Sequence, residues 1–172
     1  MLQIHEVTKS EIINYLLTLT SKELEYYDIQ NDKISETFIF ARGAWDGEKL
    51  VGIGGLAVWY RCLVHLYFMV KQPYQGQGLG RQFAALNVEY ARENNVPFLF
   101  GSAKLANVKS IKIVVNHGYE KVYDDGENYY SILLLNKKYA FVKFLLKIAL
   151  PIYSTRIGKW IRLLKKIKRL GL

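Results

Sequence analysis

Three glycines at alternate positions, Gly76, Gly78 and Gly80, separate two segments of opposite character. The run before them, 62–70, is apolar almost throughout and rich in β-formers, which predicts a strand buried on both faces. The segment that follows, 79–94, has apolar residues at helical spacing and ends at an Asn-Asn-x-Pro sequence. A glycine loop between a strand and a helix presents main-chain N–H groups and the positive end of the helix dipole to an anion. The pattern therefore predicts a phosphate-binding turn.

Two common phosphate-binding loops do not fit this spacing. The loop of nucleotide hydrolases needs Gly-x-x-x-x-Gly-Lys-Ser/Thr, which these glycines do not provide. The dinucleotide fingerprint needs a glycine at position 81, where Arg81 stands. What remains is the sequence Gln75-Gly76-Gln77-Gly78-Leu79-Gly80.

The rest of the chain alternates between strand and helix patterns. Asp-Gly pairs at 46–47 and 125–126 predict hairpin turns, because both central positions of such turns need positive φ. Thr8 is a candidate N-cap, with Glu11 three residues later. The expected elements are a strand at 2–7, helix at 8–27, a strand hairpin at 37–60, strands at 62–70 and 97–103, a helix at 106–119 ending near Gly118, and a hairpin at 120–135.

Charge is distributed unevenly along the 172 residues, of which 51% are hydrophobic. Residues 1–136 carry 13 Lys and Arg against 15 acids, a net charge of −2, whereas residues 137–172 carry 11 cations and no acid. This length predicts one globular domain at 1–136 followed by a basic appendage at 137–172. A single cysteine, Cys62, excludes an intramolecular disulfide and argues against a thiolate metal site. The N-terminus has no signal-peptide pattern, so we expect a cytoplasmic location. We also expect no metal.

The glycine loop resembles the acetyl-coenzyme A loop of the GCN5-related N-acetyltransferase (GNAT) superfamily, Gln/Arg-x-x-Gly-x-Gly/Ala. Gln75, Gly78 and Gly80 match it position by position. The segment 106–122 resembles the second signature of that superfamily, in which an Asn opens a helix that ends in Gly-Phe/Tyr. The resemblance implies an α/β (α+β) fold with a mixed, mostly antiparallel sheet flanked by helices, whose fourth and fifth strands splay apart around the pantetheine arm of the cofactor.

The resemblance also implies a set of cofactor contacts. Main-chain N–H groups of the glycine loop would bind the pyrophosphate of acetyl-CoA, Arg81 would add charge, and the main chain of Met69 and Val70 would contact pantetheine and thioester. Asn107 and Ser110 would line the channel, although Asn107 also reads simply as a helix N-cap. The expected contacts are Met69, Val70, Gln75, Gly76, Gln77, Gly78, Leu79, Gly80, Arg81, Asn107 and Ser110.

The catalytic residues depart from the family pattern. Many relatives place a Glu base on the fourth strand and a Tyr acid on the later helix, but this chain has no acid between Glu48 and Glu89 and has Val114 at the tyrosine position. His65 and Tyr67 alternate onto one strand face and are the candidate catalytic residues, although a histidine between apolar neighbours also fits a hydrogen-bonded core residue. Further candidates near the acceptor are Tyr129 or Tyr130 from the last hairpin, and Glu23, Glu25 and Asp28 from the first helical region, where a solvated helix face is the alternative.

The C-terminal tail has two parts. Lysines interrupt the apolar segment 137–153, so it is too short to cross a bilayer. Residues 154–170 place apolar residues, including Trp160, opposite a basic face, which predicts an amphipathic helix on an anionic membrane surface. The alternatives are nucleic-acid binding, packing on the domain, or a homodimer contact.

The family resemblance implies an N-acetyltransferase, and the N-terminus and the tail predict that it is cytoplasmic and lies at the inner face of a membrane. It would transfer acetyl from acetyl-CoA to a primary amine by direct attack in a ternary complex. The acceptor would be a small-molecule or lipid-linked amine, such as a cell-envelope or amino-sugar precursor. The competing classes are an inactive acyl-CoA-binding module and a nucleic-acid-binding protein acting through the tail.

Overall fold

The computed structural model describes residues 2–20, 23, 37–59 and 63–154. Its centre is a seven-stranded sheet in the order β1-β2-β3-β4-β5-β7-β6, in which every neighbouring pair is antiparallel except β4 and β5. The expected mixed, mostly antiparallel fold is confirmed. The strands are β1 (Gln3–Glu6), β2 (Phe38–Asp46), β3 (Lys49–Trp59), β4 (Leu63–Val70), β5 (Phe98–Lys104), β6 (Glu120–Asp124) and β7 (Asn128–Leu134).

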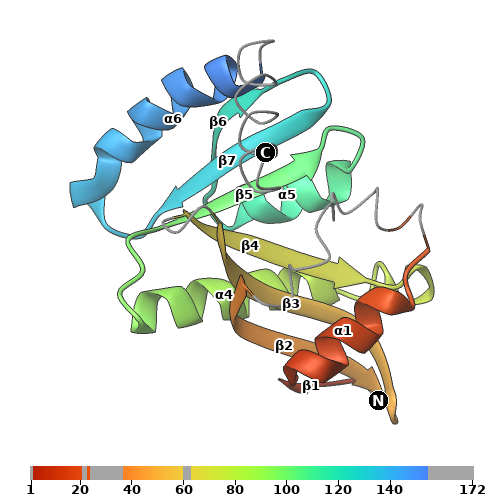
Figure 1. Cartoon of the computed structure of the whole chain (residues 1–172). Coiled ribbons are helices and arrows are strands. Elements are labelled where there is room, and N and C mark those ends of the chain that lie inside the picture. Colours follow the sequence, from red (N-terminus) through yellow and green to blue (C-terminus); the bar gives the residue numbers. More distant parts are fainter. Residues whose placement is uncertain (1, 21–22, 24–36, 60–62, 155–172) are drawn as a thin grey trace, which may run out of the picture.

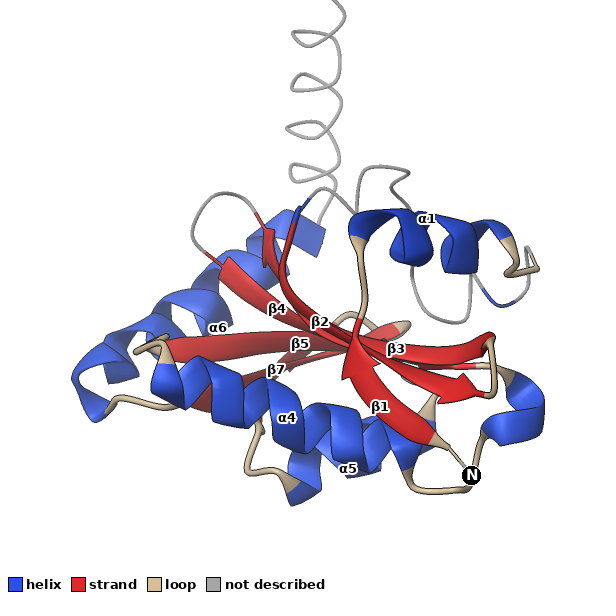
Figure 2. Cartoon of the chain, turned by 90° about the horizontal axis from the view of Figure 1, so that it is seen from below, coloured by secondary structure: helices blue, strands red, loops and turns tan. Residues whose placement is uncertain are grey.

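Helices cover both faces of this sheet (Figures 1 and 2). On one face, Leu66 of β4 shares a core with Val88 of α4 and Val114 of α5. On the other face, Met69 of β4 packs against Ile12 and Tyr15 of α1. The helices are α1 (Lys9–Leu17), α4 (Leu79–Glu93), α5 (Val108–Asn116) and α6 (Ala140–Ser154), with short 3₁₀ turns at Gln72–Tyr74 and Lys137–Tyr139.

Most predicted helix starts and turns are confirmed. The main-chain N–H of Thr8 donates to Glu11 Oε2 at 2.6 Å, and the N–H of Glu11 donates back to Thr8 Oγ1 at 3.3 Å, which closes the expected capping box at α1. Gly47 and Gly126 have φ of +58° and +87° at the two hairpin turns. Helix α1 ends at Leu17, with Thr18 as its C-cap, so the prediction of one helix over 8–27 was wrong at its C-terminal end; residues 21–22 and 24–27 of that prediction lie outside the described residues.

Strand β4 is buried on both faces, as predicted, because neighbouring residues of a strand point to opposite faces and no residue of β4 is exposed. Its buried residues come in pairs, His65 with Leu66 and Met69 with Val70, while Tyr67 and Phe68 are half-buried. The physical reason for this half-burial is the neighbouring strand. Only one residue pair, His65 with Phe100, joins β4 to β5 in the ladder, so the two strands diverge and Tyr67 and Phe68 stay half-buried (Figure 1). The splay expected from the family resemblance is present.

Close packing of α4 on the sheet fixes where its N-terminus lies. A Cβ built on Gly54 of β3 would lie 2.4 Å from Phe83 Cβ of α4, far inside van der Waals contact. Phe83 itself is fully buried. The missing side chain at Gly54 therefore lets α4 lie directly against β3, with its first turn beside the end of β4.

The first part of the tail packs onto the sheet. Leu146 of α6 shares a core cluster with Phe98 of β5 and Ile132 of β7, and Lys143 forms an ion pair with Glu120 of β6. None of the described helices combines the length and apolar character that crossing a bilayer requires. The predicted amphipathic helix at 154–170 lies outside the described residues apart from Ser154, the last residue of α6.

Candidate active site

The glycine loop joins β4 to α4 and is anchored at both ends. Gln75 Nε2 donates to the Val70 carbonyl oxygen at 3.1 Å, which ties the loop to the last residue of β4. Tyr74 Oη donates to Asp46 Oδ2 at 3.0 Å, which ties it to the β2–β3 turn. The first residue of the matched signature therefore shapes the loop through its side chain.

The three glycines are required for two different reasons. Gly76 and Gly78 have φ of +85° and +84°, where a side chain is strained whatever space surrounds it. Gly80 has an ordinary helical backbone, but its Cβ would lie 3.0 Å from Ile113 Cδ1 and 3.5 Å from Phe68 Cδ2. The alternation of glycines thus reflects backbone conformation at the first two positions and close packing of α4 against α5 at the third.

Among the described residues, the turn leaves a row of N–H groups without protein acceptors. The N–H of Gln75 donates to the Gln72 carbonyl oxygen at 3.2 Å, and that of Arg81 to the Gly78 carbonyl oxygen at 3.0 Å. Between them, the N–H groups of residues 76–80 make no hydrogen bond within the described part of the chain. The N–H groups predicted to bind the anion were those of residues 75–80. Since the Gln75 N–H already donates to Gln72, the N–H groups that can bind an anion are those of residues 76–80.

These groups border a cleft of about 250 Å³ between the α4 N-terminus, the end of β4 and α5. Three cations line it, Arg81 together with Lys109 and Lys112 of α5. Sequence reasoning missed the two lysines, although their spacing of three within a helix is a signal that they share a face. Of the predicted cofactor contacts, the cleft lining includes Val70, Gln75, Gly76, Gly78, Leu79, Gly80, Arg81, Asn107 and Ser110.

Two predicted contacts, Met69 and Gln77, do not line the cleft. The N–H of Lys71 donates to the Val51 carbonyl oxygen at 2.9 Å, so these two residues form a hydrogen-bonded pair of the β3–β4 ladder. In an antiparallel ladder every second pair is hydrogen-bonded, so the pair two residues earlier is hydrogen-bonded too. Met69 therefore lies in a hydrogen-bonded pair with Ile53, so its main chain faces β3 and its side chain is buried under α1. Phe68, whose main chain faces the diverging β5, lines the cleft in its place.

Asn107 is an N-cap, and its contact with the cofactor stays a prediction. Its Oδ1 accepts from the Ser110 N–H at 3.1 Å, so it is the N-cap of α5. It is also buried and lines the cleft beside Ser110. The cap therefore holds the first turn of α5 against the cleft.

His65 and Tyr67 project from β4 onto the opposite face of the sheet, the face covered by α1 and α6. Their ring centroids are 4.4 Å apart. His65 is buried, and its Nε2 lies 3.0 Å from Ser102 Oγ of β5, in hydrogen-bond contact across the diverging strands. Burial lowers the pKa of His65 to about 4, opposed only in part by a contact with the Leu66 main chain. The imidazole is therefore neutral at pH 7.

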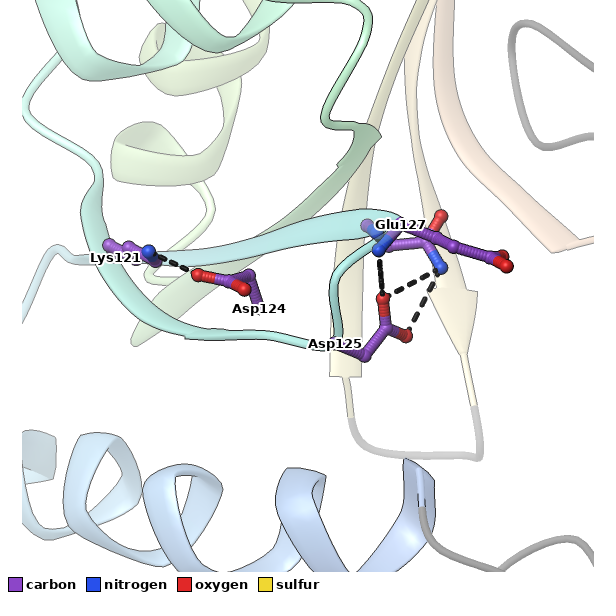
Figure 3. Close-up of polar contacts among 5 residues, drawn as sticks. Lys121, Asp124, Asp125 and Glu127 are labelled. Carbon is purple, nitrogen blue, oxygen red and sulfur yellow. Dashed lines mark hydrogen bonds and ion pairs between the residues drawn. The ribbon is translucent and has the colours of Figure 1, made fainter.

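The last hairpin adds Tyr130 and Asp125 to this face. Tyr130 pairs with Ser102 across β5 and β7, and its Oη donates to Asp125 Oδ2 at 3.0 Å. Burial disfavours the Asp125 carboxylate, but hydrogen bonds from the Asn128 main chain and side chain, the Glu127 N–H and Tyr130 outweigh it and hold the pKa of Asp125 below its usual range. Figure 3 shows the bond that Asp125 accepts from Glu127. Tyr129, the other candidate, is buried on the α4 and α5 face.

The acidic candidates in the first helical region are only partly described. Glu23 Oε2 accepts from the Thr20 N–H and Oγ1, both at 2.9 Å. These bonds lower the pKa of Glu23. Glu25 and Asp28 lie outside the described residues.

Comparison with known proteins agrees with this geometry. A sequence model described as the Acetyltransferase (GNAT) family matches residues 4–119. The chain belongs to the GNAT family. As an acyltransferase of this family, it uses acetyl-CoA. A search of curated proteins gave no match.

Solved structures share the GNAT fold at low sequence identity. An IAA acetyltransferase from Bacillus cereus is 16% identical, with 78% of this chain and 100% of that chain covered and a TM-score of 0.60. A putative acetyltransferase from Salmonella typhimurium, solved with acetyl-CoA, is 17% identical over 79% and 95% of the two chains, with a TM-score of 0.57. A ribosomal-protein-alanine N-acetyltransferase from Brucella melitensis is 20% identical over 77% and 99%, also with a TM-score of 0.57.

The cleft fits the cofactor of the GNAT family. A diphosphate needs several donors and positive charge, and the cleft lining includes Gly76, Gly78, Leu79 and Gly80, whose N–H groups make no hydrogen bond within the described residues, together with three cations. Val114, where many relatives have the tyrosine acid, is buried in the core with Leu66 and Val88, so no proton donor reaches the cleft from that position.

Proposed function

We propose that this GNAT enzyme transfers acetyl from acetyl-CoA to a primary amine by direct attack within a ternary complex. The observation that carries the proposal is that the gap between β4 and β5 separates the glycine loop from the His65 side of the sheet. The N–H groups of residues 76–80 lie on one side of it, and His65, Tyr67 and Ser102 lie on the other. An acyl group held in the gap would meet an acceptor arriving from the α1 face.

The residues present support attack by a neutral amine. The amine nitrogen forms a bond to the thioester carbon, the carbon–sulfur bond breaks, and sulfur leaves with the electron pair. A thiol with a pKa of about 8.5 can leave largely as thiolate, so the absence of a tyrosine at Val114 has a modest effect. The proton lost by nitrogen passes to solvent, since a neutral His65 with a pKa of about 4 is too weak a base to hold it at pH 7.

We therefore propose that His65 and Tyr67 lie on the acceptor side of the site and orient the groups there, and that neither takes up the proton lost by the amine. The His65 imidazole holds the Ser102 hydroxyl at the point where β4 and β5 diverge. Hydrogen bonds within the hairpin keep the Asp125 carboxylate ionised. Its negative charge can attract an acceptor amine while that amine is still protonated.

The charge and pattern of the C-terminal tail suggest which class of amine the enzyme acetylates. Residues 137–172 carry 11 cations and no acid, and 154–170 have the pattern of an amphipathic helix for an anionic membrane surface. We place the enzyme in the cytoplasm at the inner face of a membrane, acting on a lipid-linked or cell-envelope amine such as an amino-sugar precursor.

Thiol release from acetyl-CoA with a panel of amines, including amino sugars and cationic alkylamines, tests the transfer. We expect thiol release only when an amine is present, with one acetylated amine formed for each thiol. The absence of a carboxylate on β4 favours a second candidate, a module that binds acyl-CoA without turnover. Stabilisation against heat by acetyl-CoA, with no thiol release for any amine, would establish that module and overturn the transferase proposal.

A further inference from the structure

Helix α6 is apolar on two opposite faces. One face packs on the sheet through Val142, Leu146 and Leu150. The other carries large apolar side chains that are each about half exposed or more. We call these five residues the outward face: Phe141 (57% exposed), Phe144 (64%), Leu145 (52%), Ile148 (49%) and Ile152 (51%).

The outward face is a continuous surface. Its residues recur at spacings of three and four, which places them along one side of the helix. A helix with apolar residues all round is ordinarily buried, and an exposed apolar patch of this kind marks an interaction site. Within the described part of the chain, each of these five side chains keeps about half or more of its surface exposed.

The charge around the outward face identifies its partner. Lys137, Lys138 and Lys147 are exposed on or beside α6, whereas the ion pair with Glu120 occupies Lys143. No acid follows Glu127 anywhere in the sequence. An apolar strip with cations beside it complements the surface of an anionic bilayer, which offers acyl chains to the strip and phosphate groups to the lysines.

The same charges argue against two other occupants. A second copy of this chain packed face to face on α6 would bring the exposed Lys137, Lys138 and Lys147 of both copies together, which is unfavourable. A nucleic acid would attract the lysines but would leave five large apolar side chains in contact with water or phosphate.

We propose that the outward face of α6 is a docking surface for anionic lipid membranes, with the helix lying in the plane of the interface. The inference deepens the proposed membrane association and rests on it, but assigns the contact to α6 rather than to residues 154–170 alone. Since α6 and α1 cover the same face of the sheet, docking would turn the acceptor side of the enzyme toward the lipid (Figures 1 and 2).

Vesicle co-sedimentation of the full chain tests the proposal. Vesicles of phosphatidylcholine with and without phosphatidylglycerol serve as the probes. The test variant is Phe144→Gln/Ile148→Gln, and Phe144→Leu/Ile148→Leu is its apolar match. Val108→Gln/Val115→Gln changes two exposed apolar residues of α5, on the opposite sheet face. A chain that ends at Ser154 separates the contribution of residues 155–172.

We expect the full chain to bind phosphatidylglycerol vesicles and the glutamine variant of α6 to bind at least about tenfold more weakly, because it removes buried apolar area. The leucine and α5 variants should bind like the unaltered chain. If the glutamine variant bound vesicles as tightly as the unaltered chain, the inference would be overturned. If in addition the chain ending at Ser154 lost binding, the inference would still be overturned, but the proposal that residues 155–172 bind the membrane would remain intact. A dimer that the glutamine variant dissociates, with vesicle binding unchanged, would likewise overturn it.

Because the substituted side chains are exposed, the variants should retain the thermal unfolding midpoint of the unaltered chain. Thiol release measured in solution separates this inference from the transferase proposal. Loss of vesicle binding with unchanged thiol release supports the docking surface. A full chain that does not bind anionic vesicles at all contradicts both the docking surface and the proposed membrane association, and leaves acetyl transfer untouched.

Discussion

Gly78→Val is expected to weaken acetyl-CoA binding by about 100-fold, which corresponds to roughly 3 kcal/mol. Gly78 is the N-cap of α4 with φ of +84°, and a β-branched residue cannot adopt that conformation without strain. Its Cβ would meet only Gln82 Nε2, at 3.9 Å, so packing does not forbid the substitution. The turn would relax to negative φ and carry the N–H groups of residues 76–80 away from the cleft. Calorimetric titration with acetyl-CoA measures the loss.

Gly126→Val is the matched control for this substitution. Gly126 has φ of +87°, and its Cβ would have no neighbour within 4 Å, so the same strain falls on a hairpin outside the cleft lining. The control should lose thermal stability and keep the affinity for acetyl-CoA. Undiminished acetyl-CoA binding by the Gly78→Val variant would mean that the conformation of the turn is not what holds the cofactor.

Acidification is expected to destabilise the unaltered protein more than a His65→Gln variant. The pKa of His65 is about 4 in the folded protein and about 6.5 in an unfolded chain, so the unfolded chain binds the extra proton between those values. The stability contribution from this group is therefore fully present above pH 6.5 and is lost as the pH falls through that window toward 4. The loss amounts to about 3 kcal/mol.

Urea unfolding at pH 7 and at pH 4 measures this difference. The fall in the free energy of unfolding between the two pH values should be smaller in His65→Gln by about 3 kcal/mol. His5→Gln, which changes an exposed histidine of β1, should follow the unaltered protein. Equal falls in the unaltered protein and His65→Gln would show that His65 accepts a proton in the folded state, and would return it as a candidate general base.

The order of strands and helices could be predicted because each boundary carries its own local chemistry. The Thr8 cap with Glu11, the Asp-Gly turns and Gly118 after α5 act within a few residues, and the structure has each of them. Gly78 was predictable for the same reason. The motif also includes Gly80, but the reason why this position needs a glycine is contact with Ile113, which is 33 positions away and comes near only in the folded chain.

The features that sequence did not predict depend on contacts between distant segments. The partial exposure of Tyr67 and Phe68 in β4 follows from the divergence of β5, which no local pattern in 62–70 reveals. The sequence did not single out Ser102, yet its hydroxyl lies 3.0 Å from His65 Nε2 across that divergence. A polar residue in an apolar strand was the available signal. The packing of α6 through Leu146 could not be predicted either, because its partners Phe98 and Ile132 lie on strands that are distant in the sequence.

The central claim is that main-chain N–H groups of residues 76–80 hold the diphosphate of acetyl-CoA, and a titration followed by amide NMR tests it most directly. On addition of acetyl-CoA to the ¹⁵N-labelled protein, the amide signals of Gly76, Gly78 and Gly80 should shift further than those of the β6–β7 hairpin. Saturable binding that moves other signals and leaves these three in place would contradict the account, as would a complete lack of binding.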